Sequence, residues 1–254
     1  MSSPLLQARS LVKHYGSVEA LRGASFEVSA GEVVSLIGDN GAGKSTFIKC
    51  LSGAEQPDSG EILLGGEQVR LDSPTTARAL GIETVYQDLA VAPDLDPAAN
   101  LFLGRELKRK GLLGALGMLD KAEMRRRARA EFSRLGVNLQ SLDVPIGALS
   151  GGQRQSVAVA RSVVWASKVV FMDEPTAALG VVQRERVLDV IRKVRDQGIA
   201  VVLISHNMPE VLSVSDRVEV LRLGKRVARF KAAETSLEEL VGAMTGALVQ
   251  EDAA

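Results

Sequence analysis

The chain contains three apolar runs in which hydrophobic and polar positions do not alternate. They lie at Glu32–Ile37, Lys168–Met172 and Ile199–Ile204. A strand that is apolar on both sides has to be covered on both faces, which is typical of the central strands of a parallel sheet. Helical patterns follow the runs, from about Phe47, Gln183 and Asn207 onward. The pattern therefore predicts an α/β fold with a parallel sheet at its centre.

Shorter β-prone runs separated by glycines predict antiparallel strands near both ends of the chain. In the N-terminal part they occupy residues 5–28 and residues 60–69, the second around a Gly-Gly turn. Near the C-terminus, residues 217–230 predict a hairpin, and a helical tail follows. Ile82–Tyr86 is expected to form one more strand, which ends at Gln87.

Between residues 89 and 148 the pattern changes to helical pieces separated by proline and glycine. Asp120 followed by Glu123 is typical of a capped start, so we expect a helix from there to about Leu135. The arginines of this helix are more typical of a solvated face than of a phosphate or partner contact; they are Arg125, Arg126, Arg127 and Arg129. We expect an inserted α-helical subdomain in this region.

Composition and charge restrict the class of protein. Of the 254 residues, 46% are hydrophobic, enough for a buried core without disulfides. Lys and Arg (31) balance Asp and Glu (31), so no overall positive charge indicates a nucleic acid partner. The single cysteine, Cys50, is expected to be buried on the first helix. No signal peptide is evident, and Arg161 and Lys168 interrupt the longest apolar stretch, so we expect no membrane-spanning helix.

The first candidate site is a glycine-rich loop between the first apolar run and the helix that follows. Its residues are Gly38, Asp39, Asn40, Gly41, Ala42, Gly43, Lys44, Ser45 and Thr46. They fit the phosphate-binding pattern G-x-x-x-x-G-K-[ST], in which backbone N–H groups at a helix start surround a phosphate. Lys44 is expected to reach the β- and γ-phosphates and Ser45 to bind Mg²⁺. This segment, the phosphate loop, predicts nucleotide binding.

Polar side chains follow three other expected strands. In parallel α/β sheets ligands bind at the carboxyl ends of the strands, so these side chains are candidates for the same site. Asp173 is placed to bind Mg²⁺, and Glu174 to polarise an attacking water. His206 could hydrogen-bond a γ-phosphate, although a lone histidine is usually structural. Gln87 could reach the metal or the water through its amide oxygen.

A second glycine-rich helix start remains unexplained by nucleotide binding alone. It is Leu149-Ser150-Gly151-Gly152-Gln153, which leads into a helix expected from about Gln153 to Ala166. Like the phosphate loop, it would offer free backbone N–H groups to an anion. Because one nucleotide has one γ-phosphate, a second such site indicates a partner. We call Ser150 to Gln153 the second glycine turn.

The order and rough spacing of these segments resemble the ATP-binding cassette ATPases over essentially the whole chain. The resemblance implies a P-loop NTPase core with a parallel sheet, an N-terminal antiparallel β subdomain and an inserted α-helical subdomain. It implies ATP and Mg²⁺ as ligands, Glu174 as the general base and His206 as the γ-phosphate contact. It also implies that Tyr15 stacks on adenine, whereas the residues alone favour Tyr15 packing on the sheet. The second glycine turn would complete the ATP site of another copy in a head-to-tail dimer.

The same resemblance implies a single cassette domain over residues 5–246. Its nucleotide-binding core would comprise residues 5–88 and 149–230, its helical subdomain residues 89–148, and a helical tail residues 231–254. The helical insertion, with Gln87 at its hinge, is where such ATPases bind integral-membrane permease subunits. The chain would then work as a peripheral protein at the cytoplasmic face of the cell membrane.

Residues 85–90, 100–106 and 176–181 resemble the monosaccharide-importer branch, of ribose, xylose and fructose type. This finer resemblance implies a homodimer that serves, indirectly, a periplasmic sugar-binding protein. The pattern departs at Gly180, where most of the superfamily has an aspartate that signals across the dimer. Gly180 keeps open the alternative of a non-catalytic nucleotide-binding regulatory subunit. A soluble cassette ATPase of translation or DNA repair is the other alternative. No nucleic acid partner is expected.

Overall fold

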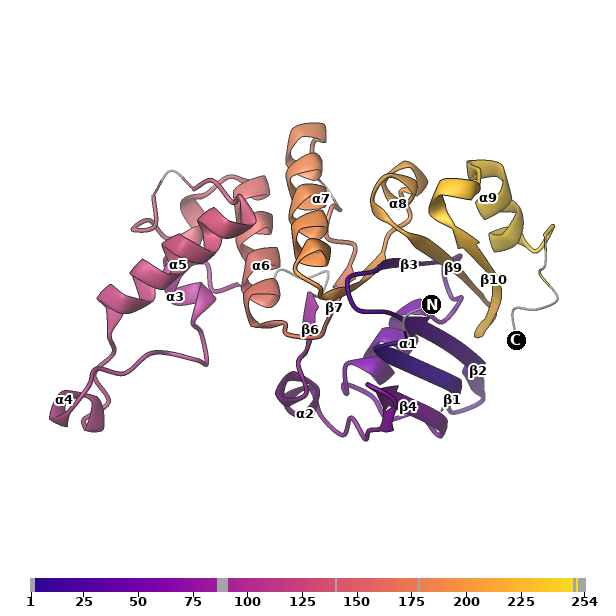
Figure 1. Cartoon of the computed structure of the whole chain (residues 1–254), viewed down its shortest axis with the longest axis horizontal. Coiled ribbons are helices and arrows are strands. Elements are labelled where there is room, and N and C mark those ends of the chain that lie inside the picture. Colours follow the sequence, from indigo (N-terminus) through magenta and orange to yellow (C-terminus); the bar gives the residue numbers. More distant parts are fainter. Residues whose placement is uncertain (1–2, 86–90, 140, 178, 249, 251–254) are drawn as a thin grey trace. The chain divides into compact units, whose positions relative to one another are not determined.

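The computed structural model describes residues 3–85, 91–139, 141–177, 179–248 and 250 (Figure 1). Contacts divide the chain into two compact units. The first comprises residues 1–87, 166–175 and 194–254, and the second comprises residues 88–165 and 176–193.

The first unit contains a six-stranded sheet in the order β10-β9-β3-β8-β7-β6. Its strands are β3 (Val33–Ile37), β6 (Ile82–Val85), β7 (Val169–Asp173), β8 (Ala200–Ile204), β9 (Arg217–Arg222) and β10 (Lys225–Lys231). All neighbours pair in parallel except β9 and β10, which form an antiparallel hairpin. Every residue of β3 and β8 is buried, because both faces of these strands are covered. The predicted central parallel strands are confirmed.

A second, antiparallel sheet of this unit has the order β2-β1-β4-β5. Its strands are β1 (Leu6–Tyr15), β2 (Val18–Val28), β4 (Ser59–Leu64) and β5 (Glu67–Gln68). Its apolar face shares one core with α1 (Lys44–Leu51), where the rings of Phe26 and Phe47 meet edge to face at 5.8 Å. Cys50 is fully buried in this core, and burial raises the pKa of its thiol to about 11. The N-terminal antiparallel sheet and the buried cysteine are thus confirmed.

A buried charge cluster joins the two sheets of the first unit. Glu219 on β9 is fully buried, and its carboxylate lies 2.9 Å from Arg217, 3.3 Å from Arg226 and 2.9 Å from Arg229. Arg229 also donates to Glu27 of β2 at 2.8 Å. A carboxylate is tolerated in a protein interior only when it is paired and hydrogen-bonded, as it is here. This cluster therefore ties β9 and β10 to the antiparallel sheet.

Three helices complete the first unit beside α1. They are α2 (Pro74–Ala79), α8 (Met208–Val214) and α9 (Leu237–Thr245). Ser73 caps α2 by accepting the Thr76 backbone N–H, and Pro74 stands at the first helical position. Ser236 and Glu239 form a reciprocal capping box at the start of α9. Within the described residues, no helix has the length and hydrophobicity needed to span a membrane.

The second unit is helical. It contains α3 (Pro97–Leu101), α4 (Leu112–Ala115), α5 (Lys121–Leu135), α6 (Gly151–Trp165) and most of α7 (Val181–Asp196). The Asp120 carboxylate caps α5 by accepting the Glu123 N–H at 3.1 Å, and Gly136 ends the helix in a left-handed conformation, so this predicted helix is confirmed. The indole of Trp165 donates to the Leu101 carbonyl at 2.9 Å and thereby ties α6 to α3.

Candidate functional site

The phosphate loop connects the carboxyl end of β3 to the start of α1 (Figure 1). Gly38, Gly41 and Gly43 have φ angles of 153°, 82° and 104°, a region that side chains disfavour. A Cβ at Gly38 would collide with the Leu221 carbonyl oxygen, and one at Gly43 would lie 2.6 Å from the Ala20 carbonyl oxygen. The neighbours that exclude a side chain at these two positions are therefore backbone atoms.

Lys44 folds back across this loop. Its Nζ donates to the Gly38 carbonyl at 2.5 Å and to the Asp39 carbonyl at 3.0 Å. Burial lowers the pKa of Lys44, while the nearby carboxylates of Glu174, Asp39 and Asp173 act in the opposite direction. The ammonium is thus half-buried and close to the end of β7, where an anionic ligand would meet it.

Among the described residues, no side chain caps the free N–H groups in the first turn of α1. Gly43, its N-cap residue, has no side chain to do so, and no acidic residue lies in the first turn. The free N–H groups and the helix dipole leave a positive end of the kind that binds phosphate. Ser45 and Asn40 are exposed there, and Ala42 is buried beneath the loop. Thr46, next to Ser45, is half-buried.

Asp173 and Glu174 lie at the carboxyl end of β7, next to β8. Glu174 adopts a left-handed conformation with a φ of 50°, and its N–H donates to the Ile204 carbonyl at 2.9 Å. Its carboxylate Oε1 lies 3.1 Å from His206 Nδ1, and the side chain is only 18% exposed. A left-handed non-glycine residue costs roughly 1–3 kcal/mol and is common at functional sites. The turn after β7 thus aims Glu174 toward the end of β8.

Oxygen ligands at this edge fit a Mg²⁺ ion. Burial raises the pKa of the Asp173 carboxyl, and the Glu174 carboxylate raises it further, against the effect of Lys44 and His206. A bound cation would stabilise the charged form of this carboxylate. Among the described residues no group of three or more His, Cys, Asp or Glu side chains could hold a metal by themselves. Mg²⁺ in phosphate sites typically uses one or two protein oxygens plus the phosphates, so Asp173 and Ser45 are the candidate protein ligands.

The second glycine turn lies at the start of α6, in the second unit. Here the helix start is closed by its own side chains. The Gln153 N–H donates to Ser150 Oγ at 3.3 Å, and the Ser150 N–H donates to Gln153 Oε1 at 3.1 Å. Gly151 is exposed, and a Cβ placed on it would meet no atom within 4 Å. The glycine at 151 is therefore not required by the packing of this chain.

Gln183 was not among the predicted site residues. A Cβ on Gly152 would collide with the Gln183 side chain, and a Cβ on Gly180 would lie 2.8 Å from Gln183 Oε1. Gln183 on α7 thus packs against both the second glycine turn and Gly180. No sequence signal marks Gln183, because the contact joins segments about 30 residues apart.

Tyr15 ends β1 opposite Val18 of β2. The two side chains are 41% and 62% exposed, and Lys13 Nζ lies 5.7 Å from the centre of the Tyr15 ring. The ring is accessible to a planar partner, as base stacking requires. Gln87 lies outside the described residues, so its predicted role stays a prediction.

Comparison with known proteins identifies the family of the chain. The ABC transporter family profile matches residues 21–177. The chain is 51% identical to the fructose import ATP-binding protein FrcA of Rhizobium meliloti, over 96% of this chain and 95% of FrcA. It is 44% identical to the xylose/arabinose import ATP-binding protein XylG of Sulfolobus acidocaldarius, over 96% of this chain and 94% of XylG. The structure of MJ1267, an ATP-binding cassette of an ABC transporter, matches with a TM-score of 0.83 and 25% identity over 96% and 98% of the two chains. The chain belongs to the ABC transporter family, as one of its ATP-binding subunits.

Proposed function

We propose that this chain hydrolyses Mg-ATP to drive a monosaccharide importer, as a homodimer bound to integral-membrane permease subunits at the cytoplasmic face. One observation carries the proposal: Lys44, Asp173, Glu174 and His206 come from three different segments and gather at the carboxyl ends of β3, β7 and β8. The similarity to FrcA and XylG, whose names specify fructose and xylose/arabinose import, supports the choice of sugar.

Each residue has a distinct task in this proposal. Lys44 and the N–H groups at the start of α1 hold the phosphates and neutralise the negative charge that grows on the γ-phosphate. Glu174 accepts a proton from the attacking water, and His206 orients Glu174 through the 3.1 Å contact and reaches the γ-phosphate. Tyr15 stacks on the adenine. Bound at Asp173, Ser45 and Gln87, Mg²⁺ would supply charge neutralisation at the phosphates.

The second glycine turn supplies the other half of the site in this proposal. Ser150 Oγ and the N–H groups of Gly151 and Gly152 would contact the γ-phosphate held by a second copy. The hydrogen bonds between Ser150 and Gln153 are 3.1 and 3.3 Å long, at the weak end of the usual range, so the ligand's negative charge could replace them. A periplasmic sugar-binding protein would deliver the sugar to the permease and does not touch this chain.

Steady-state ATP hydrolysis by the purified chain tests the proposal. Glu174→Gln should bind ATP normally but hydrolyse it about 10²- to 10⁴-fold slower, as expected when a general base is lost. The matched control is Glu67→Gln, an exposed carboxylate on β5, which should hydrolyse ATP like the wild type. Near-normal turnover of the Glu174→Gln variant would remove this residue from the role of base.

The same assay separates the enzyme from a regulatory subunit. A wild-type chain that binds ATP but does not hydrolyse it, alone or with its permease, would support the regulatory alternative that Gly180 leaves open. Sugar uptake into proteoliposomes that contain the permease then tests the transport function. Uptake that does not depend on ATP would contradict the proposal.

A further inference from the structure

Residues 107–119 of the second unit form a closed hairpin, which we call the hairpin arm. The Asp120 N–H donates to the Leu107 carbonyl at 2.7 Å, and the Arg109 N–H donates to the Met118 carbonyl at 2.9 Å. The short helix α4 lies between these two paired segments. Gly114 packs so closely on the Arg109 backbone that a Cβ there would collide with it. The arm is therefore a defined structure that can hold side chains in fixed positions.

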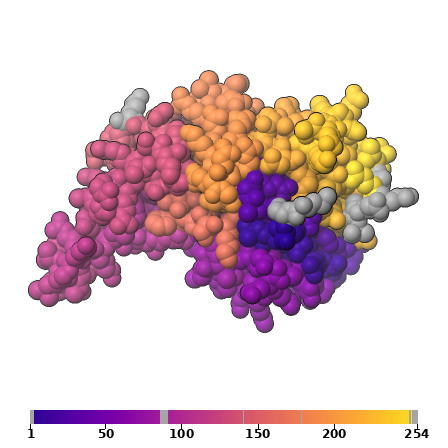
Figure 2. Space-filling view, in the orientation of Figure 1, coloured from indigo at the N-terminus to yellow at the C-terminus, as the bar shows by residue number. Residues whose placement is uncertain are grey.

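Four large apolar side chains are exposed on the hairpin arm. Leu112 is 78% exposed and Leu116 is 73% exposed, and Leu113 and Met118 are nearly half exposed. The arm projects from the rest of this unit, with α4 at its tip, away from α3 and α5 (Figures 1 and 2). Scattered exposed leucines are normal on protein surfaces, but four large apolar side chains within seven residues are a patch that water solvates poorly.

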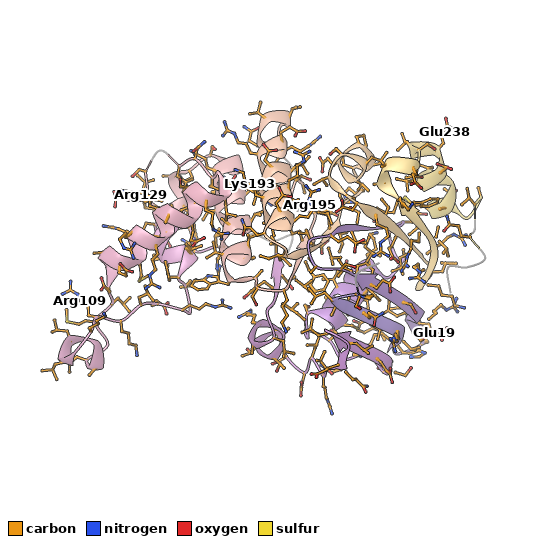
Figure 3. The ribbon with its side chains drawn as sticks, in the orientation of Figure 1. Glu19, Arg109, Arg129, Lys193, Arg195 and Glu238 are labelled. Carbon is orange, nitrogen blue, oxygen red and sulfur yellow. The ribbon has the colours of Figure 1, made fainter. Side chains whose placement is uncertain are left out.

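Three consecutive cations border this patch. Lys108, Arg109 and Lys110 are all exposed, and none forms an ion pair in the described part of the chain. Figure 3 labels Arg109, which lies close to α4. Residues 107–119 contain no acidic residue, although the whole chain has equal numbers of acids and bases. The nearest acids have other tasks: Glu106 accepts the Gly104 N–H at 2.9 Å, Asp120 caps α5, and Glu123 accepts from Arg126 and Arg127 at 2.6 and 2.7 Å. The local excess of three positive charges is thus available to an external anion.

We propose that the hairpin arm docks directly on the surface of an anionic lipid membrane, with its leucines among the headgroups and its cations on lipid phosphates. Exposed leucines next to unpaired Lys and Arg are the combination that binds such surfaces. A protein partner fits less well, because the cores of protein interfaces are depleted of lysine. This contact differs from binding to a permease and does not depend on nucleotide.

Sedimentation with lipid vesicles tests the proposal on the full-length, nucleotide-free chain without any permease. The chain should bind vesicles of phosphatidylglycerol and phosphatidylcholine and show little binding to phosphatidylcholine alone. Removing the three cations together, as Lys108→Gln, Arg109→Gln and Lys110→Gln, should weaken binding about 100-fold, since each cation near an anionic surface contributes about fivefold. Leu112→Ser with Leu116→Ser should weaken it by a further factor of about ten or more.

The matched control removes the same charge from α5. Arg126→Gln, Arg127→Gln and Arg129→Gln change exposed arginines of the same unit and should leave most of the vesicle binding intact. All variants should keep wild-type ATP affinity and circular dichroism, because the changed side chains lie on the surface. If the two triple variants lost vesicle binding to the same extent, the proposal would be overturned. Vesicle binding that requires the permease would also overturn it. Self-association through Leu112 and Leu116 without vesicle binding would assign the patch to a second copy instead.

Discussion

The phosphate loop and the second glycine turn are both glycine-rich helix starts, but they differ in what occupies them. At α1 the N-cap residue is Gly43, which offers no side-chain acceptor, and Lys44 lies over the loop. At α6 the Ser150 hydroxyl and the Gln153 amide close the turn on itself. The backbone N–H groups at the start of α1 are thus free to bind an anion. At the start of α6 the Ser150 and Gln153 side chains occupy the corresponding groups, so a ligand must first replace these internal hydrogen bonds.

The glycines of the two starts also differ in what requires them. Backbone carbonyls of Leu221 and Ala20 exclude a side chain at Gly38 and Gly43, and backbone atoms cannot move aside cheaply. At Gly152 the obstacle is the side chain of Gln183, and at Gly151 there is none. The fold itself therefore requires Gly38 and Gly43 of the phosphate loop, whereas the packing of this chain does not require Gly151.

Removal of Lys44 should produce the largest contrast between the two starts. Lys44→Ala deletes a charged donor to the phosphates, and hydrogen bonds to charged groups contribute about 1.5–3 kcal/mol each. We expect ATP affinity, measured by isothermal titration calorimetry, to fall about 100-fold. Lys49→Ala, an exposed lysine on the same helix, should not change the affinity. Unchanged affinity of Lys44→Ala would contradict the assignment of the phosphate loop.

The substitution Ser150→Ala should show that the two helix starts have different functions. The ATP affinity of the single subunit should stay at the wild-type value, while steady-state hydrolysis falls about tenfold because one contact to the γ-phosphate is lost. The variant also loses a cap and about 1 kcal/mol of unfolding free energy. Ser236→Ala removes the corresponding cap of α9 and should cost similar stability with no loss of hydrolysis. Weaker ATP binding by the single Ser150→Ala subunit would place the second glycine turn in the same site as Lys44.

Alanine at the two glycines of α6 should give opposite changes in stability. Gly151→Ala meets no atom and gains helix propensity, so it should stabilise the chain by up to about 1 kcal/mol. Gly152→Ala forces Gln183 aside and should destabilise it by about 1–3 kcal/mol. Chemical unfolding of both variants measures the difference. Adding Gln183→Ala to Gly152→Ala should recover part of the loss; no recovery would refute the contact as its cause.

The pH dependence of stability should show the smallest difference between the site at the phosphate loop and the second glycine turn. Burial raises the pKa of Asp173 above its usual value of 3.8, so the ligand-free fold favours the protonated carboxyl. The corresponding stability is fully present below the usual pKa and is lost as the pH rises through the raised one. Asp173→Asn should therefore be slightly more stable than the wild type at pH 7 but not near pH 3. Ser150→Ala changes no ionisable group, and its unfolding curve should run parallel to that of the wild type across this range.

Much of the fold could be predicted from the chain. The buried strands β3, β7 and β8 have apolar runs without alternation, and the N-cap residues Ser73 and Asp120 indicate where α2 and α5 begin. Helix starts were less predictable. The helix α6 begins at Gly151 and α7 at Val181, each two residues before the expected start. A glycine in the first turn resembles a loop in the sequence, because its helical conformation depends on hydrogen bonds such as those of Ser150.

The candidate site was predictable where a motif carries the chemistry and unpredictable where contacts do. Lys44, Asp173 and Glu174 follow apolar strands, so their convergence follows from the rule that ligands bind at carboxyl ends. The packing of Gln183 against Gly152 depends on how two helices meet, and no local pattern encodes it. The hairpin arm was likewise missed, because its leucines do not recur at a helical spacing long enough to indicate an amphipathic helix.

The charge cluster around Glu219 has a consequence for how this chain can change over generations. Breaking a buried ion pair by removing one partner costs about 3–5 kcal/mol, whereas replacing the whole set by apolar residues is often neutral. Loss of Glu219 alone would remove the carboxylate that Arg217, Arg226 and Arg229 share, although Arg217 would keep Glu32 and Arg229 would keep Glu27. In descendants of this chain, exchange of Glu219 should therefore be accompanied by exchange of the arginines around it.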